Sequence, residues 1–343
     1  MSNRLPKWII LILAAFILFV FDISTGSVTI PFNDIINSMT GEEVKQSWYN
    51  IIWEFRMPKA ITAVLVGAGL SVCGLQMQTL FKNPLAGPFV LGISSGASMG
   101  VALVILAGTM FGSVLYQMAF GNWIMVIAAS LGSSAVLLIV TLVSIRVKDS
   151  MSLLIIGLMF GSATGALVSV LQYFSNAEQV QLFLIWTFGS LGGLNWDELN
   201  VLMPIVLIGL FMNLFLLKPL NAILMGEQYA VSMGINVKQF RILLVISASL
   251  LAGSITAFCG PIAFIGLAVP HLSRFLVNTS NHKVLLPTVA RMGVVVMLFC
   301  DIISQLPGSE HVLPINAITS IIGAPIVVSI ILNRKSIKNT FSS

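Results

Sequence analysis

The sequence predicts an all-α membrane protein that crosses the bilayer about ten times. Of its 343 residues, 57% are hydrophobic and only 8% are charged, and the mean hydropathy is +1.00. A soluble domain typically carries about 25% charged residues. The apolar residues fall into stretches of about 20 residues, the length that one transmembrane helix needs. We therefore predict one polytopic transmembrane domain over residues 1–343, and the lack of a basic stripe argues against nucleic-acid binding.

The ten predicted spans are separated by short polar or proline-containing segments. They cover residues 8–23, 58–80, 89–108, 122–145, 152–173, 198–217, 239–258, 261–277, 284–304 and 314–332. The first span follows two basic residues, as in a signal peptide, but no clean cleavage site follows it, so we expect it to remain uncleaved. Residues 24–57 are polar enough to lie outside the membrane. Pro261 and Pro270 predict a short or kinked eighth helix.

The distribution of basic residues predicts the orientation of these spans. With the N-terminus in the cytoplasm, thirteen lysines and arginines fall inside and only Lys45, Arg56 and Lys59 fall outside. Such an excess is typical of cytoplasmic loops. An even number of spans also returns the C-terminus to the side of the N-terminus.

A proline-rich break and two glycine ladders interrupt the apolar pattern. The segment 83–88 (Asn-Pro-Leu-Ala-Gly-Pro) cannot continue a helix, and the charge distribution places it on the cytoplasmic side. Glycines spaced by four let another helix approach closely. The ladders are predicted to pack against a helix or to line a pathway, and they comprise Gly92, Gly96, Gly100, Gly157, Gly161 and Gly165.

No residue pattern predicts catalysis or metal binding. Residues 92–96 (Gly-Ile-Ser-Ser-Gly) match the nucleophile elbow of hydrolases, but that elbow needs a strand before the serine. Its only candidate partners, His271 and Asp301, are predicted near opposite membrane faces. The three histidines and three cysteines have no ligand spacing. We therefore expect no catalytic residue, no bound metal and no cofactor in this chain.

The positions of charged residues within the spans indicate whether the chain could be an ion-coupled transporter. Arg291 and Asp301 lie in the ninth span, about 15 Å apart along a helix, so they should not pair within one copy. Asp301 should sit close to the outer interface. An ion-coupled carrier usually holds its coupling site near the midplane. The sequence offers no midplane carboxylate, so an ion-coupled secondary transporter of a small organic solute is only the alternative.

Two segments outside the spans could bind partners. Around residues 219–237, Pro219 should stop the sixth span, Gly226 should break the segment, and Gly234 should end a second short helix. Its apolar residues suit either an amphipathic surface linker or a docking element for a cytoplasmic partner. Arg56 and Lys59 suit either interfacial anchoring of a helix end or docking of an acidic partner from outside.

Several motifs, in order and with similar spacing over about residues 24–333, closely resemble one family of transporters. They are 56–59 (Arg-Met-Pro-Lys), 67–70 (Gly-Ala-Gly-Leu), 83–88, 91–97 (Leu-Gly-Ile-Ser-Ser-Gly-Ala), 260–271 (from Gly-Pro-Ile-Ala-Phe to Val-Pro-His), Asp301 and 322–325 (Ile-Gly-Ala-Pro). The chain resembles FecCD-type permease subunits of the ABC importers for iron siderophores, haem and cobalamin. The resemblance implies a type II importer architecture with ten spans per subunit.

The resemblance also implies partners and roles. The expected partners are a second permease copy, identical or closely related, two cytoplasmic ATPase subunits that use ATP and Mg²⁺, and an external substrate-binding protein. The expected location is a bacterial inner membrane, with both termini cytoplasmic. Ferric siderophore is the default cargo, and haem and cobalamin remain open.

The family's functional positions can be carried over to this sequence as expectations. ATPase coupling would fall to Leu224, Gly226, Glu227, Tyr229, Ala230, Met233 and Gly234, and the cytoplasmic gate to Ser150, Met151 and Ser152. The ladder at 157–165 would line or support the pathway, and Arg56 and Lys59 would face acidic residues of the binding protein. The last outer loop, 305–312, carries Glu310 and no arginine, so one basic docking contact of the family would be missing.

Overall fold

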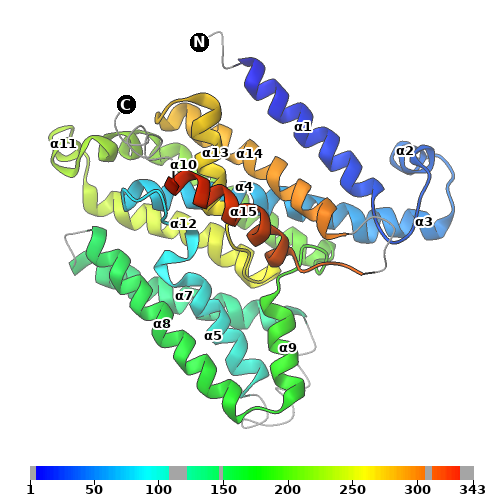
Figure 1. The fold of residues 1–343 in the computed structure, drawn as a ribbon, viewed down its shortest axis with the longest axis horizontal. Helices are drawn as coiled ribbons and strands as arrows, with labels where there is room; N and C mark the ends of the chain where they lie inside the picture. Colours follow the sequence, from blue (N-terminus) through cyan, green and yellow to red (C-terminus); the bar gives the residue numbers. More distant parts are fainter. Residues whose placement is uncertain (1–4, 108–121, 147–149, 306–310, 333–343) are drawn as a thin grey trace.

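The computed structural model describes residues 5–107, 122–146, 150–305 and 311–332, and every regular element in them is a helix (Figure 1). Seven helical stretches are long and apolar enough to cross a membrane. They contain α1 (Leu5–Ser24), α4 (Met57–Leu80), α7 (Asn122–Arg146), α8 (Ser150–Phe174), α10 (Trp196–Met225), α12 (Val237–Cys259) and α14 (His282–Ser304). Three shorter apolar helices are α5 (Ile93–Ile105), α13 (Ile265–Val277) and α15 (Ile315–Leu332). Together they occupy the ten predicted positions, which confirms the fold class.

The central helix of the structure is α4. It packs against α14, α13, α10 and α12, and it runs across the middle of the view in Figure 1. A helix that is apolar on all sides is one that is buried all round. Two backbone approaches tighten its contacts: Gly67 lies against Gly293 of α14, and Gly74 lies against Gly266 of α13.

A second group of helices, α5, α7 and α8 together with the short α9 (Ala177–Thr187), lies beside the first (Figure 1). Here α5 packs against both α7 and α8. A Cβ atom added to Gly96 would lie 2.5 Å from the Gly132 carbonyl oxygen, and one added to Gly100 would lie 2.0 Å from that of Ala128. These two ladder positions thus bring the α5 and α7 backbones together. The group joins the first through contacts between α7 and α12.

The helix that contains the second span begins before the span itself. Residues 24–57 were expected to lie outside the membrane, and within them α3 (Gln46–Asn50) and η1 (Ile51–Arg56) continue directly into α4. The combined helix of 35 residues is about 52 Å long, whereas the hydrocarbon core is about 30 Å thick. Its first part must therefore project beyond the hydrocarbon. There α2 (Phe32–Thr40) packs beside it, with the Trp53 indole donating a hydrogen bond to Ser38 Oγ (3.1 Å).

Two other differences have local causes. The predicted span 89–108 is a 3₁₀ turn, η2 (Pro88–Leu91), followed by α5, because Gly92 adopts a left-handed φ of +73° between them. The helix α9 was not predicted. Its start is a capping box in which Asn176 and Gln179 exchange side-chain hydrogen bonds with each other's backbone amides. That spacing is visible in the sequence and could have identified the helix.

The contact between α4 and α14 makes a testable prediction. Replacing Gly67 with alanine would place a Cβ atom 2.4 Å from the Gly293 carbonyl oxygen, so the two helices must separate. Overpacking of this kind costs about 1–3 kcal/mol or more. We expect Gly67→Ala to lower the unfolding temperature of the purified protein in detergent. Gly193→Ala is the control, because an added Cβ there meets only Ser190, at an ordinary contact distance of 3.7 Å. Equal stability of the two variants would contradict this account of the packing.

Candidate functional site

The segment after the sixth span differs from the prediction in one respect. Pro219 does not stop the helix: α10 runs through it to Met225. Proline in a helix interior costs about 3 kcal/mol. The residues beyond it offset this cost, because Leu220 and Ile223 are buried in the main core cluster and Asn221 is hydrogen-bonded to the start of α14. Instead of two short helices, the segment therefore contains the end of α10 and one short helix, α11 (Glu227–Ser232).

The short helix α11 is fixed at both ends. Gly226, with φ of +128°, makes the predicted break, and Gly234, with φ of +80°, makes the predicted stop. The Ile235 amide donates to the Ala230 carbonyl (3.0 Å), which closes the helix end. An ion pair between the Glu227 carboxylate and the Arg241 guanidinium (2.5 Å) ties α11 to α12.

The seven predicted coupling residues divide into two groups. Ala230 is completely buried, Leu224 is half-buried, and Glu227 makes the ion pair, so these positions hold the segment in place. Tyr229 and Met233 are exposed. The exposed apolar side chains of this surface, which we call the α11 cap, are Met225, Tyr229, Val231 and Met233. In Figure 1 the cap lies at the opposite end of the molecule from α2 and α3.

The predicted gate and the second ladder lie on α8. Met151 is exposed and Ser152 is half-buried at the start of the helix, whereas the side chain of Ser150 lies outside the described residues. A Cβ atom on Gly92 would be 3.2 Å from the Gly157 carbonyl oxygen, so this pair brings η2 and α8 together. An added Cβ on Gly165 meets no atom of this chain. Beside it, small residues form an exposed face of α8, namely Ser162, Ala166 and Ser169.

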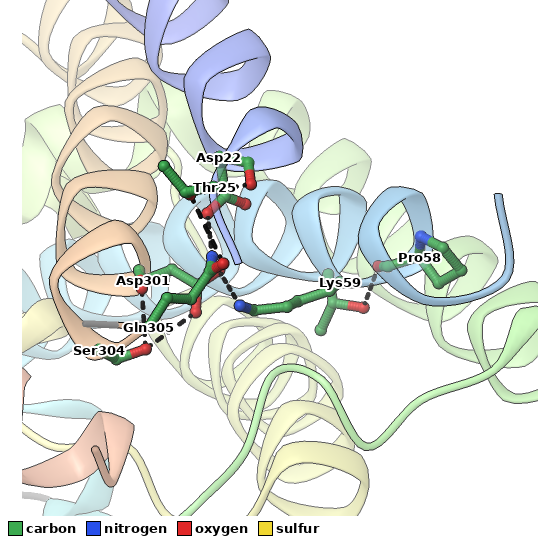
Figure 2. Close-up of polar contacts among 8 residues, drawn as sticks. Asp22, Thr25, Pro58, Lys59, Asp301, Ser304 and Gln305 are labelled. Atoms are coloured by element: carbon green, nitrogen blue, oxygen red, sulfur yellow. Dashed lines mark hydrogen bonds and ion pairs between the residues drawn. The ribbon is translucent and has the colours of Figure 1, made fainter. Parts of the chain in front are cut away.

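At the other end of the molecule, polar side chains from α1, α4 and α14 form a cluster, which we call the Lys59 cluster (Figure 2). The Lys59 ammonium lies 3.2 Å from the Asp301 carboxylate. The Gln305 amide donates to Asp22 (2.7 Å) and lies 3.4 Å from Asp301. Both carboxylates are buried, with 3% exposure for Asp22 and 1% for Asp301. The cluster therefore joins α14 to α1 and α4, although α14 lies more than 200 residues later in the sequence.

Arg56 also makes its hydrogen bonds within the chain. Its guanidinium donates to the carbonyl oxygens of Ile23 (2.8 Å), Ser24 (3.0 Å) and Val28. A cavity of about 340 Å³ lies beside it, lined partly by Asp22, Lys59 and Gln305. Arg56 and Lys59, the predicted docking residues, thus tie the end of α1 and α14 to the start of α4. Glu310 of the last outer loop lies outside the described residues.

The structure separates Arg291 from Asp301, as predicted. Arg291 lies 5.1 Å from the centre of the Trp8 ring and donates to the Pro287 carbonyl. The residues around Ser94 do not form a nucleophile elbow, because η2 rather than a strand precedes them. Among the described residues there is no group of three or more histidine, cysteine, aspartate or glutamate side chains that could hold a metal ion.

A polar network at the end that carries the α11 cap was not predicted. The His282 ring bridges the side chains of Asn221 (2.9 Å) and Thr79 (2.9 Å). Nearby, the Arg274 guanidinium donates to Gln78 (2.7 Å). The predicted break at 83–88 lies here too, since His271 Nε2 donates to the Pro84 carbonyl (2.8 Å). Asparagine, threonine and histidine at unrelated positions carry no local pattern, so only the folded chain reveals the network.

The helices and their two polar ends define a polytopic membrane protein with the architecture of a type II ABC importer permease. The profile of the FecCD transport family matches residues 12–333. The chain therefore belongs to the FecCD transport family, in which it is a permease.

Three relatives show how far the similarity extends. An ABC transporter permease protein of Methanocaldococcus jannaschii is 36% identical, covering 90% of this chain and 91% of its own length. The hemin transport system permease protein of Yersinia pestis is 33% identical, covering 90% of each. A solved structure described as an inward-facing metal-chelate type ABC transporter superposes with a TM-score of 0.82 at 29% identity, covering 95% of this chain and 99% of that one.

The Lys59 cluster predicts the effect of removing its lysine. Lys59→Met would leave two buried carboxyl groups without the ammonium that faces Asp301. Removing one partner of a buried ion pair typically destabilises a protein by about 3–5 kcal/mol. We expect a lower unfolding temperature in detergent, with partial recovery in the double variant Lys59→Met/Asp301→Asn. Lys45→Met is the control, since Lys45 only covers the Trp48 ring. If the double variant is no more stable than Lys59→Met, the ion pair does not explain the loss.

Proposed function

We propose that this permease is the membrane-spanning subunit of a binding-protein-dependent importer in a bacterial inner membrane, with both termini cytoplasmic. Two copies of the chain form the pathway, two ATPase subunits bind its cytoplasmic face, and an external binding protein delivers the cargo. ATP and Mg²⁺ act within the ATPase subunits. The permease supplies a path and a gate, and it breaks no covalent bond.

The α11 cap is the observation that carries this proposal. It exposes four large apolar side chains at one end of the molecule: Tyr229 and Val231 lie on the six-residue helix α11, and Met225 and Met233 lie on either side of it. Exposed apolar groups gathered in one place are typical of protein interfaces. The helix is also fixed to the membrane domain through Ala230 and the Glu227–Arg241 ion pair. A partner bound to the cap can therefore move α10 and α12, because the cap connects these two helices.

Motion of the cap is proposed to drive transport. ATP binding draws the two ATPases together, and the caps follow. The permease then shifts between outward-open and inward-open states. This coupling requires ATP to favour one of the two states, because equal affinity for both would shift nothing.

The face of α8 supports a pathway shared by two copies. Only 17% of the most apolar part of α8 is buried within the chain. A span that faces lipid alone usually presents large apolar residues, whereas small residues are enriched where helices meet. The exposed small residues of α8 (Ser162, Gly165, Ala166 and Ser169) therefore support contact with the second copy or with the cargo. Met151 and Ser152, with Ser150, would form the gate at the cytoplasmic end of this face.

We propose an iron chelate as the cargo, with a ferric siderophore as the first candidate and haem and cobalamin as the others. The names of the similar proteins, a hemin permease and a metal-chelate transporter, support this class. Within the described spans no acidic residue lies near the middle of a helix. That distribution disfavours the alternative of an ion-coupled carrier.

The cargo can be tested by growth. A strain that lacks its own iron-chelate and cobalamin permeases should regain growth on one chelate class when it expresses this chain together with its ATPase and binding protein. Ferric siderophore and haem are each supplied as the only source of iron, and cobalamin is tested separately as the only source of cobalamin. Growth on a siderophore alone supports the first candidate, and growth on none of the three contradicts the proposed cargo class.

Coupling can be tested at Gly226. A bulky residue such as leucine cannot adopt its φ of +128° without strain, so α11 should lose its position. In proteoliposomes containing the ATPase, we expect Gly226→Leu to reduce both uptake and cargo-stimulated ATP hydrolysis at least tenfold, with normal membrane insertion. Ser232→Leu is the control, because Ser232 is exposed and has an ordinary helical position. Unchanged uptake by Gly226→Leu would contradict the coupling role of the cap.

A further inference from the structure

The polar network at the cap end contains one side chain that connects three helices. His282 is the first residue of α14 and is 1% exposed. Its Nδ1 atom lies 2.9 Å from Asn221 Oδ1 on α10, and its Nε2 atom lies 2.9 Å from Thr79 Oγ1 on α4. These contacts span 61 and 203 residues of sequence. We call this arrangement the His282 clasp.

The hydrogen bonds determine which ring nitrogen carries the proton. Asn221 Oδ1 also accepts from the His282 backbone amide (2.8 Å), and its Nδ2 atom donates to Asn281 Oδ1 (3.2 Å). The Asn221 amide is thereby oriented with its oxygen toward the ring. Because a carbonyl oxygen can only accept, Nδ1 of the ring must carry the hydrogen. In the neutral ring Nε2 is then an acceptor, facing the Thr79 hydroxyl.

Thr79 has two acceptors for a single hydrogen. Its Oγ1 lies 2.9 Å from the Leu75 carbonyl oxygen on its own helix and 2.9 Å from His282 Nε2 on α14. A threonine hydroxyl donates one hydrogen bond at a time. The hydroxyl can therefore either join α4 to α14 or turn back to α4. Both arrangements leave the hydroxyl hydrogen-bonded, but the second leaves the buried His282 Nε2 without a donor, so opening the link has a cost that movement of the cap must offset.

The clasp lies between the cap and the centre of the fold. Asn221 belongs to the part of α10 that continues beyond Pro219 and leads directly to α11. Thr79 and His282 belong to α4 and α14, the two most extensively packed helices. At their other ends the same two helices are joined by Lys59 and Asp301. Asn221 and His282 thus connect the part of α10 nearest the cap to both α4 and α14.

We propose that His282 is the positioning residue through which movement of the α11 cap is transmitted to α4 and α14, and that the Thr79 hydroxyl is the part of this link that opens and closes. The inference rests on the proposed function of the cap as the ATPase contact. It assigns a role in coupling to residues that touch neither ATP nor cargo. A purely structural role would affect stability and leave the ratio of transport to hydrolysis unchanged.

The test measures cargo molecules imported per ATP hydrolysed in proteoliposomes that contain the full complex. Thr79→Val removes the hydroxyl and keeps the shape of the side chain, and Thr79→Ser restores the hydroxyl. Thr62→Val is the matched control: Thr62 is equally buried in α4, but its hydroxyl donates only to Pro58 of the same helix (2.8 Å). We expect Thr79→Val to lower the ratio at least threefold, while Thr79→Ser and Thr62→Val remain near the unmodified protein.

One variant of the histidine keeps only half of the clasp. An asparagine amide can replace Nδ1 and keep the bond to Asn221, but it cannot reach Thr79 as Nε2 does. We expect His282→Asn to lower the ratio as Thr79→Val does, and the double variant Thr79→Val/His282→Asn to be no worse than either. Full additivity of the two losses would overturn the proposal of one shared link.

Two further measurements separate the possible failures: the unfolding temperature of each variant, and cargo import by the unmodified complex. If Thr79→Val and Thr62→Val lose stability equally and keep the same ratio, the clasp is only structural and the inference is wrong. If the unmodified complex imports cargo without ATP hydrolysis, the proposed function itself fails. The two failures are therefore distinguishable within one set of vesicles.

Discussion

The close packing of α4 against α14 is the contact on which the rest of the structure depends. Gly67 and Gly293 allow the two backbones to touch, and the other core helices are arranged around this pair. A membrane interior offers no hydrophobic driving force between helices, so close van der Waals contact and hydrogen bonds must hold them together. Small residues at the crossing allow the close van der Waals contact. Polar side chains at three positions of α4 supply the hydrogen bonds and an ion pair.

Three polar contacts hold the central helix α4 to different neighbouring helices. Lys59 pairs with Asp301 at the start of α4, and Thr79 meets His282 at the end near the cap. About one turn before Thr79, Gln76 donates to both Asn213 (2.7 Å) and Ser247 (2.9 Å), and all three residues are completely buried. A buried polar group without a partner in the hydrocarbon region is costly. Each contact therefore specifies which helices lie beside α4: the Lys59 contact holds the ends of α1 and α14, and the Gln76 and Thr79 contacts lie toward the end that carries the cap.

The sequence predicted local features well and distant contacts poorly. Ten apolar segments, the break at Gly226 and the stop at Gly234 depend on neighbouring residues, so composition and spacing reveal them. The continuation of α10 through Pro219 was missed, because the buried residues that stabilise it contact other helices. The engagement of Lys59 by Asp301 was missed for a similar reason. Both residues were recognised as unusual charges, but no spacing rule links two side chains 242 positions apart.

The sequence alone determined that the chain is a helical membrane protein, how its spans are ordered and which family it resembles, because hydrophobicity and short motifs act within one segment. The tertiary structure decided which charges are engaged within the chain, which face of each helix is exposed and which polar residues meet across helices. The physical reason is that a hydrogen bond or an ion pair forms only within about 3–4 Å. Sequence distance carries no information on that separation until the helices have packed around α4.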